Sequence, residues 1–212
     1  MNDKVNAIIN YFDEILPDVE CELNYENDIQ LLIAVVLSAQ TTDKSVNKVT
    51  EVLYEDCPTI SELYKLEVGD IEEYIKRLGL YRNKSKNVFK LIKIIFEDYN
   101  GIVPNSYEKL VELPGVGRKT ANVVLAEFFM VPAIAVDTHV ERVSKRLKLA
   151  YMSDSVLKVE QKLMKKFPKE KWIKLHHQFI HFGRYICKAQ SPQCSGCKLK
   201  KYCRYYKSME PK

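Results

Sequence analysis

The chain has 212 residues, of which 46% are hydrophobic and 29% are charged, with a formal net charge of +5 and only 7 glycines and 8 prolines. This balance is typical of a globular protein and excludes a disordered or fibrous chain. The longest apolar run, residues 31–37, is far shorter than the roughly 18 residues of a membrane-spanning helix, and the N-terminus lacks a basic segment followed by an apolar stretch. We therefore expect a soluble cytoplasmic protein with no membrane partner.

Apolar residues recur at helical spacing almost throughout, and no two alternating runs flank a hairpin signal, so we expect an all-α fold. Asp28 is expected to cap a helix that is apolar on every side, and Thr42 or Asp43 to start the next one. Gly79 and Gly101 are expected to end two later helices. In chain order, helices are expected over residues 28–40, from 42 or 43, from 59, and over 69–79, 83–99, 106–113, 118–129, 137–149, 153–167 and 171–187.

The charge is distributed unevenly along the chain. Residues 1–75 hold 4 basic and 17 acidic residues, a net charge of −13, whereas residues 76–212 hold 29 basic and 11 acidic residues, a net charge of +18. A basic face attracts phosphate backbones because binding releases their counterions. Nucleic acid is therefore the leading partner, and a solvated lysine-rich surface is the simpler alternative.

Four of the six cysteines fall in the last 26 residues: Cys187, Cys194, Cys197 and Cys203. Without a secretion signal a disulfide framework is not expected, so clustered thiols at short spacing indicate metal ligands. Four thiolates suit a structural zinc ion, and their spacing differs from that of bacterial ferredoxins. The residues alone therefore leave zinc and an iron–sulfur cluster open.

A glycine turn joins two expected helices at residues 113–121, Leu-Pro-Gly-Val-Gly-Arg-Lys-Thr-Ala. Gly115 and Gly117 are expected to adopt left-handed angles and let the backbone approach a ligand, with amide N–H groups pointing outward at the start of the second helix. The turn is therefore a candidate phosphate site. The alternative is a helical hairpin that simply needs glycine.

The motif LPGVGRKTANVV at 113–124 resembles the helix-hairpin-helix of the endonuclease III family of DNA glycosylases. VDTHV at 136–140 resembles the aspartate segment of that family, C-x6-C-x2-C-x5-C resembles its [4Fe-4S] loop, and LLIAVVLSAQTTD at 31–43 resembles its first barrel helix and base-pocket loop. The resemblance covers nearly the whole chain. It implies two helical domains: a six-helix barrel with the helix-hairpin-helix at 22–131, and a cluster domain made of 1–21 plus 132–212.

The resemblance implies two catalytic residues. Lys119 would be the nucleophile, and its place beside Arg118 in the first turn of a helix is expected to lower its pKa. Its neutral amine would attack the sugar carbon that bears the base, leaving a Schiff base from which β-elimination cuts the strand. Asp137, an expected helix cap, would stabilise the positive charge that develops on the sugar and help to move the protons of the lysine.

Further residues are implied in DNA binding. Gln40 would fill the gap left by the extruded base, Leu80 would be an apolar wedge beside the opposite strand, and Asp43 would line the base pocket unless it only caps a helix. The turn residues Gly115, Val116, Gly117 and Arg118 would meet phosphates. A cluster on the four cysteines would hold a basic loop, with Lys200 and Lys201, against the backbone.

We therefore expect a monomeric, bifunctional DNA glycosylase and AP lyase that removes oxidised or damaged pyrimidines from damaged double-stranded DNA. A monofunctional mismatch glycosylase of the same fold and a non-catalytic iron–sulfur DNA-binding protein are the alternatives, and Lys119 argues against both, since related adenine glycosylases lack it. The lesion range is not defined by any short motif. His139 has no assigned role, and the group His176, His177 and His181 is expected to be packing.

Overall fold

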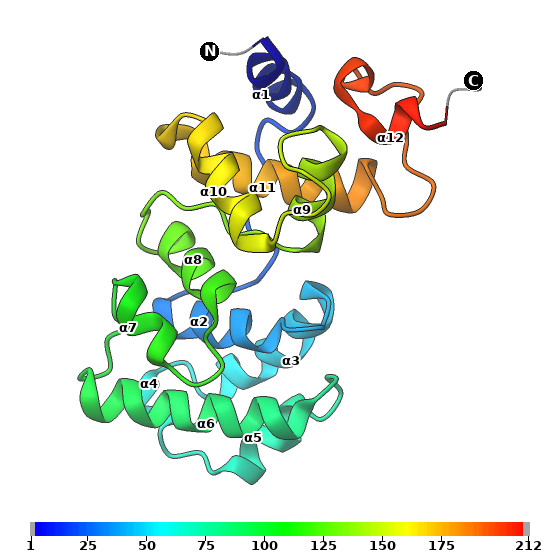
Figure 1. Cartoon of the computed structure of the whole chain (residues 1–212). Coiled ribbons are helices and arrows are strands. Elements are labelled where there is room, and N and C mark those ends of the chain that lie inside the picture. The colour runs from blue at the N-terminus through cyan, green and yellow to red at the C-terminus, as the bar shows by residue number, and fades with distance from the viewer. Residues whose placement is uncertain (1–2, 210–212) are drawn as a thin grey trace. The chain divides into compact units, whose positions relative to one another are not determined.

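The structure is a computed structural model and describes residues 3–209. Within that range it contains α-helices α1 to α12, two 3₁₀-helical segments η1 and η3, one π-helical segment η2, and no β-strand (Figure 1). The expected all-α fold is confirmed. No helix among the described residues is both long and apolar enough to cross a membrane.

The chain divides into two compact units. The central unit is Cys21–Val131, and the terminal unit combines Met1–Glu20 with Pro132–Lys212. The description of these units as a six-helix barrel and a cluster domain stays a prediction.

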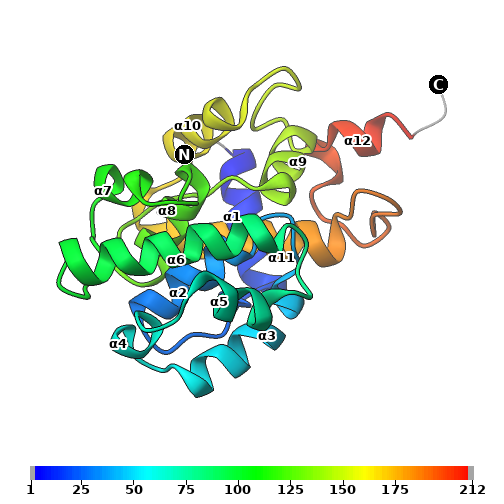
Figure 2. The ribbon, with the colours of Figure 1, turned by 90° about the horizontal axis from the view of Figure 1, so that it is seen from below.

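The central unit is built around one buried helix. Its helices are α2 (Asp28–Leu37), α3 (Asp43–Asp56), α4 (Ile60–Leu63), α5 (Val68–Ile75), α6 (Tyr81–Asp98), α7 (Tyr107–Glu112) and α8 (Arg118–Glu127). Every residue of α2 from Ile29 to Leu37 is buried, because α3, α6 and α8 all pack against this helix (Figure 2). A helix that is apolar on all sides needs such an enclosed position.

Two helix ends in the central unit differ from the expected ones. Asn27, not Asp28, is the N-cap of α2, and its side chain accepts a hydrogen bond from the N–H of Gln30. Gly79 does not end α5, which stops at Ile75, and the left-handed residue in this turn is Leu80, the N-cap of α6. Gly101 does follow the end of α6 with a φ of 78°, as expected.

The terminal unit contains a first helix that the sequence pattern did not predict. Its elements are α1 (Asp3–Ile15), α9 (Thr138–Arg146), α10 (Val156–Lys166), η1 (Lys169–Lys171), α11 (Trp172–His181), η2 (Phe182–Ile186), η3 (Lys200–Tyr202) and α12 (Arg204–Lys207). One core joins α1 to α11: the Phe12 ring lies 5.1 Å from Phe179 and 5.0 Å from Phe182, measured between ring centroids. The apolar face of α1 is therefore buried against residues more than 160 positions away.

The expected helix at 171–187 is interrupted near its end. The segment η2 is a π-helical turn, closed by the N–H of Cys187 donating to the carbonyl of Phe182 at 2.6 Å. Gly183 in this turn lies against α9, where an added Cβ would come within 2.8 Å of the His139 Cβ. The turn continues α11 and leads directly into the cysteine-rich loop (residues 187–203).

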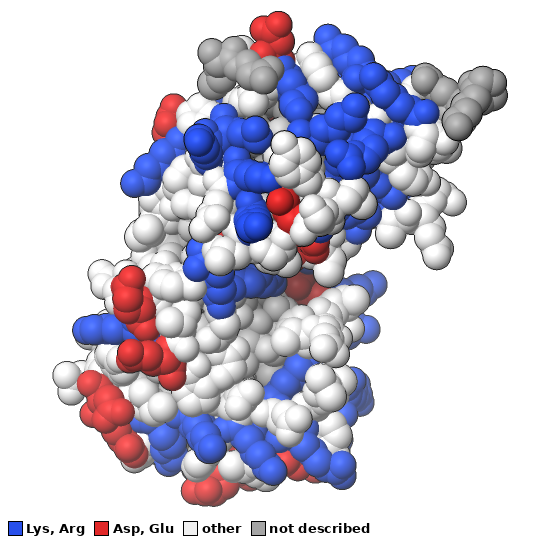
Figure 3. Space-filling view, in the orientation of Figure 1, with Lys and Arg blue, Asp and Glu red and all other residues white. Residues whose placement is uncertain are grey.

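The two units carry opposite net charges. The terminal unit has 20 basic and 11 acidic residues, a net charge of +9, and the central unit has 13 basic and 17 acidic residues, a net charge of −4. On the face shown in Figure 3, Lys and Arg side chains of the terminal unit gather over α9, α10 and the C-terminal segment. The fold thus joins an acidic N-terminal segment to the basic C-terminal part of the chain.

Candidate functional site

The glycine turn between α7 and α8 needs glycine at its first position. Gly115 has a φ of 79°, in the left-handed region, as expected. A Cβ at this position would lie 3.0 Å from Val36 Cγ1 and 3.2 Å from Asn87 Cβ. Because Gly115 has no side chain, the turn can pack closely against α2 and α6.

Gly117 is glycine for a different reason. The expected left-handed angle is wrong, because its φ is −96° and its ψ is −180°, the extended conformation usual for an N-cap residue. A Cβ added to Gly117 would have no neighbour within 4 Å among the described residues, so the backbone faces open space. A ligand could approach the first turn of α8 closely here.

Val116 and Arg118 differ in what they offer a ligand. The expectation that the amides of this turn point outward fails at Val116, whose N–H donates to the Leu113 carbonyl at 3.0 Å and whose side chain is buried. Arg118 is exposed, and its Nη1 donates to the hydroxyl of Tyr107 at 3.0 Å. This contact fixes the guanidinium beside the start of α8.

Lys119 is exposed and is the second residue of α8. The neighbouring charges act on the buried thiol of Cys21. Burial is the main cause that raises the pKa of this thiol to about 12, and the negative charges of Glu127 and Asp43 raise it further. The positive charge of Lys119 lowers it. These side chains therefore lie around one thiol within the central unit. Lys119 and Asp43 thus both act on the same thiol.

Asp43 is the first residue of α3 but does not cap it. The cap is Thr42, whose Oγ1 accepts a hydrogen bond from the N–H of Ser45 at 3.3 Å. Asp43 is half-buried. The structural alternative for this residue, helix capping, is therefore wrong.

Gln40 and Leu80 have the same unusual backbone conformation. Their φ angles are 54° and 59°, in the left-handed region that non-glycine residues seldom adopt. Both side chains are exposed, and Leu80 is 57% exposed although it is large and apolar. Asn100, Met130, Lys148 and Ser191 share this conformation, so the angle is not specific to these two turns.

Asp137, in the terminal unit, is the N-cap of α9 as expected. Its Oδ1 accepts hydrogen bonds from the N–H groups of His139 and Val140, both at 2.8 Å. Capping thus occupies one carboxylate oxygen. The side chain is half-buried.

His139 lies beside this cap and contacts the π-helical turn. Burial lowers its pKa, and its Nδ1 lies 3.2 Å from the Nη2 of Arg142. The same Nη2 donates to the Gly183 carbonyl at 2.7 Å. His139 therefore has a packing role between α9 and η2.

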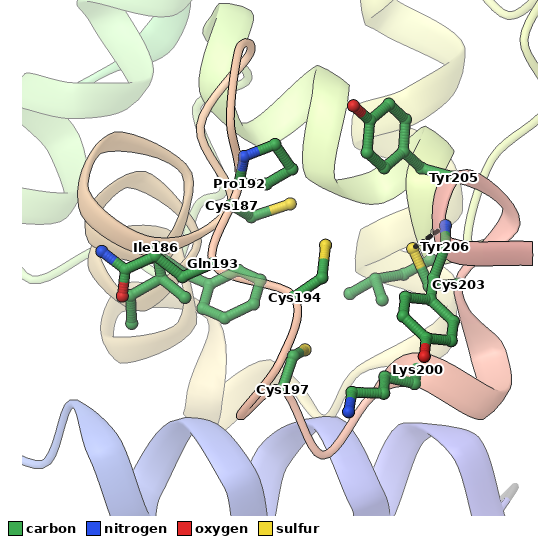
Figure 4. A pocket seen from close by; sticks show the side chains of 12 residues that line it. Ile186, Cys187, Pro192, Gln193, Cys194, Cys197, Lys200, Cys203, Tyr205 and Tyr206 are labelled. Carbon is green, nitrogen blue, oxygen red and sulfur yellow. Dashed lines mark hydrogen bonds between the residues drawn. The ribbon is translucent and has the colours of Figure 1, made fainter. Parts of the chain in front are cut away.

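The cysteine-rich loop surrounds one cavity. The cavity has about 380 Å³ of empty space, part of it open to solvent, and apolar residues such as Leu147, Phe182 and Ile186 form much of its wall. Figure 4 shows that the sulfur atoms around this hollow belong to Cys187, Cys194, Cys197 and Cys203. Among residues 3–209, no three His, Cys, Asp or Glu side chains are close enough to bind a single metal ion together.

Two arginines of α9 that the sequence reasoning did not single out hold this loop. Arg146 Nη1 lies 3.3 Å from Cys187 Sγ and donates to the Lys188 carbonyl at 2.7 Å, and its guanidinium lies 4.0 Å from the centre of the Tyr205 ring. Arg142 also donates to the Cys187 carbonyl, at 3.3 Å. The two arginines are four residues apart, which places both on one face of the helix, and this spacing is the feature of the sequence that could have identified them.

The loop lysines differ in exposure. Lys200 is half-buried, lines the cavity, and donates to the carbonyl of Ser195. Lys201 is exposed. Lys201, whose Nζ lies 4.9 Å from the centre of the Tyr202 ring, is therefore the more accessible of the two for a phosphate backbone.

The three remaining histidines lie on α11. His176 and His177 are buried, with ring centroids 5.2 Å apart, and His181 Nε2 is 3.1 Å from the Glu20 carbonyl. The three histidines therefore pack helix α11 within the terminal unit.

Comparison with known proteins gives consistent matches. The model of the HhH-GPD superfamily base excision DNA repair proteins matches residues 33–169. The chain is 54% identical over 191 residues to Endonuclease III of Bacillus subtilis, covering 90% of this chain and 87% of the relative. It is 45% identical over 194 residues to Endonuclease III of Escherichia coli, covering 92% of each.

Solved structures agree with these matches. A trapped Endonuclease III–DNA covalent intermediate has a TM-score of 0.93 and 51% identity, with 98% of this chain and 99% of that chain covered. A thermostable thymine-DNA glycosylase shares the fold, with a TM-score of 0.81 and 24% identity over 96% of this chain and 95% of that chain. The family resemblance seen in the sequence is confirmed.

Proposed function

Because this chain belongs to the HhH-GPD superfamily of base excision DNA repair proteins, we propose that it is a bifunctional DNA glycosylase and AP lyase that excises oxidised or ring-damaged pyrimidines from duplex DNA. The observation that carries the proposal is Lys119, an exposed amine on the first turn of α8, directly behind an open glycine turn. The matches to Endonuclease III over most of the chain support the same activity.

Lys119 acts as the nucleophile. Its Nζ lone pair forms a bond to the sugar C1′ while the bond from C1′ to the base breaks, and the base leaves with that electron pair and takes up a proton. Opening of the sugar ring gives a protonated imine. Loss of a proton from C2′ then expels the 3′ phosphate, and water releases the lysine. The covalent DNA intermediate described for a relative of the same fold supports this route.

Asp137 supplies negative charge while C1′ becomes electron-poor. Its Oδ1 is used by the helix cap, so Oδ2 is the oxygen left to face the developing charge or to accept a proton from the lysine. The two backbone hydrogen bonds fix the carboxylate before substrate binds. Such preorganisation is what makes an electrostatic contribution effective in catalysis.

DNA is held by its phosphates and opened by the two exposed turns. The open backbone at Gly117 and the guanidinium of Arg118 offer a phosphate site at the start of α8. The terminal unit, with its net charge of +9, attracts the DNA backbone. Gln40 and Leu80 fill the space that the extruded nucleotide leaves. A protein that acts on duplex DNA in this way would work in the cytoplasm, beside the chromosome.

The four cysteines of the loop would hold a [4Fe-4S] cluster. Their sulfur atoms face one shared cavity with apolar walls, and thiolates are the ligands that iron–sulfur clusters use. Such a cluster supplies folding energy to the loop. Lys201 would then be presented to DNA on an ordered loop, which Arg142 and Arg146 of α9 hold in place.

Borohydride trapping on an abasic duplex tests the proposed activity. Borohydride reduces a Schiff base to a stable amine, so the wild-type protein should become covalently linked to the oligonucleotide. Lys119→Gln should abolish both trapping and strand cleavage, while binding weakens by only about one phosphate contact.

Arg118→Gln is the matched control, since it removes the neighbouring cation from the same helical turn. It should weaken DNA binding and still trap. Trapping by Lys119→Gln at the wild-type level would assign the nucleophile elsewhere, and loss of trapping in both variants would leave only a DNA-binding role for this turn. A mismatch glycosylase that acts without a Schiff base would not trap even as wild type.

A further inference from the structure

Four turns of the central unit hold a non-glycine residue in the left-handed region, at Gln40, Leu80, Asn100 and Met130. Side-chain contacts link two of these turns. Gln40 lies in the turn between α2 and α3, and Leu80 lies in the turn between α5 and α6. Both side chains are exposed. A conformation of this kind persists only where neighbouring contacts hold it, so the contacts that fix each turn matter for where its side chain points.

A buried lysine connects the two turns. Lys84 is only 5% exposed, and its Nζ donates a hydrogen bond to the Oγ1 of Thr41 at 2.6 Å. Its own N–H donates to the carbonyl of Leu80 at 3.1 Å. A single residue on the first turn of α6 thus contacts both the Leu80 turn and the Gln40 turn.

The Thr41 hydroxyl extends this connection around Gln40. It accepts from Lys84 and donates to the carbonyl of Ala39 at 3.3 Å. Ala39 and Thr41 flank Gln40, so this bond closes the turn in which Gln40 is held in its left-handed conformation. The hydrogen bonds therefore run continuously from Leu80 through Lys84 and Thr41 to Ala39.

Stability alone does not account for an ammonium group in this position. Burial lowers the pKa of Lys84, and no carboxylate among the described residues is a recorded partner of its Nζ. A buried cation with a single neutral acceptor is a costly way to fill space that a methionine side chain would fill more easily. What Lys84 adds over methionine is the directional bond to Thr41.

We propose that Lys84 is a positioning residue that ties the Gln40 turn to the Leu80 turn, so that both side chains enter the DNA duplex together when the damaged nucleotide is extruded. The inference rests on the proposed function, because it concerns the same base-extrusion step. The Nζ of Lys84 is used by Thr41 inside the central unit. It acts by keeping two distant turns in one fixed geometry.

The test measures extrusion separately from bond chemistry. The substrate is a duplex with 2-aminopurine beside the lesion, whose fluorescence rises when the neighbouring base leaves the stack. Lys84→Met and Thr41→Val should each slow extrusion and single-turnover excision about tenfold, the effect of losing ~1.4 kcal/mol. Both variants should keep the wild-type rate of borohydride trapping on a single-stranded abasic oligonucleotide, where no base must be extruded.

Thr41→Ser is the matched control because it keeps the hydroxyl and removes only a methyl group. It should extrude at the wild-type rate, and the double variant Lys84→Met, Thr41→Val should be no slower than either single variant, since both remove the same bond. Wild-type extrusion by Thr41→Val, or a defect in Thr41→Ser as large as that in Thr41→Val, would overturn the inference. The comparison of Thr41→Val with Thr41→Ser remains decisive if Lys84→Met fails to fold. Borohydride trapping by the wild-type protein tests the proposed function by itself, independently of the extrusion rates of the variants.

Discussion

Single residues in this protein are selected by different physical constraints even when they look alike in the sequence. Gly115 and Gly117 are separated by one residue, yet the first has a left-handed backbone packed against Val36 and Asn87, and the second has an ordinary extended backbone facing open space. The first glycine is required by the fold. The second is open for an approaching ligand.

Substitution by alanine should separate these two roles. Gly115→Ala should lower the free energy of unfolding by about 2–4 kcal/mol, because it adds a left-handed alanine and a close contact with α2 and α6. Gly117→Ala should change stability by less than about 0.5 kcal/mol but weaken binding to undamaged duplex roughly tenfold, because the methyl group keeps a phosphate away from the amides of α8. Urea unfolding and fluorescence anisotropy measure the two effects. Equal DNA affinity of Gly117→Ala and wild type would remove the phosphate site from this turn.

Asp137 combines a structural and a proposed catalytic role that substitution can also separate. Asp137→Asn should keep the cap of α9, because asparagine caps helices as well as aspartate does, but single-turnover excision should slow by about 10²- to 10³-fold. Asp137→Ala should show the same slow excision together with a loss of ~1 kcal/mol in stability. Excision by Asp137→Asn at the wild-type rate would reduce Asp137 to a cap.

At the scale of elements, the end of α11 determines where the cysteine-rich loop begins. The π-helical turn η2 passes close to α9 at Gly183 and delivers Cys187 beside Arg146. From α1, the hydroxyl of Tyr11 donates to the Gly196 carbonyl at 3.5 Å, and Glu14 accepts from Lys198 Nζ at 2.7 Å. The loop is therefore held by a helix on each side.

The two adjacent lysines of this loop should respond differently to charge reversal. Lys201→Glu should leave the fold and the visible absorbance expected of a bound cluster intact, weaken binding to damaged and undamaged duplexes alike, and reduce the salt dependence by about one phosphate contact or more. Lys200→Glu should disturb the loop itself, because Lys200 donates to Ser195 within it. Affinity measured between low and moderate salt, with the visible spectrum as a control, distinguishes these effects. A selective loss of damaged-DNA binding in Lys201→Glu would contradict a phosphate role.

At the scale of the whole molecule, the basic surface and the cysteine-rich loop belong to one unit. The terminal unit combines the first 20 residues with the last 81, and it holds 20 of the 33 basic residues. A metal group bound by the loop would therefore stabilise the same unit that carries most of the positive charge.

Metal analysis tests this arrangement. The purified protein should contain iron and acid-labile sulfide in equal amounts and absorb broadly in the visible range, because charge transfer from thiolate to iron is coloured whereas zinc thiolate is not. Cys197→Ser should yield poorly soluble protein, since loss of a ligand removes energy that orders the loop. Cys57→Ser, outside the loop, is the control and should keep the colour. Zinc without sulfide in protein purified without air would contradict the cluster and leave the lysine chemistry in place.

The sequence by itself determined the all-α class and the features that depend on neighbours within a few residues. Asp137 as a cap and Gly115 as a left-handed residue follow from local chemistry, and the structure confirms both. The four cysteines could be grouped because they lie close together in the chain. The family could be recognised from short motifs whose order and spacing are retained.

Only the tertiary structure decided features that depend on contacts between distant segments. Helix α1 is stabilised by aromatic packing against α11, and nothing near Phe12 in the chain signals Phe179. The left-handed angle of Leu80 and the buried position of Lys84 have no local cause, since a leucine in isolation avoids the first and a lysine avoids the second. The buried position of Lys84 is satisfied by Thr41, 43 positions earlier, which provides the acceptor that the folded chain brings within 2.6 Å.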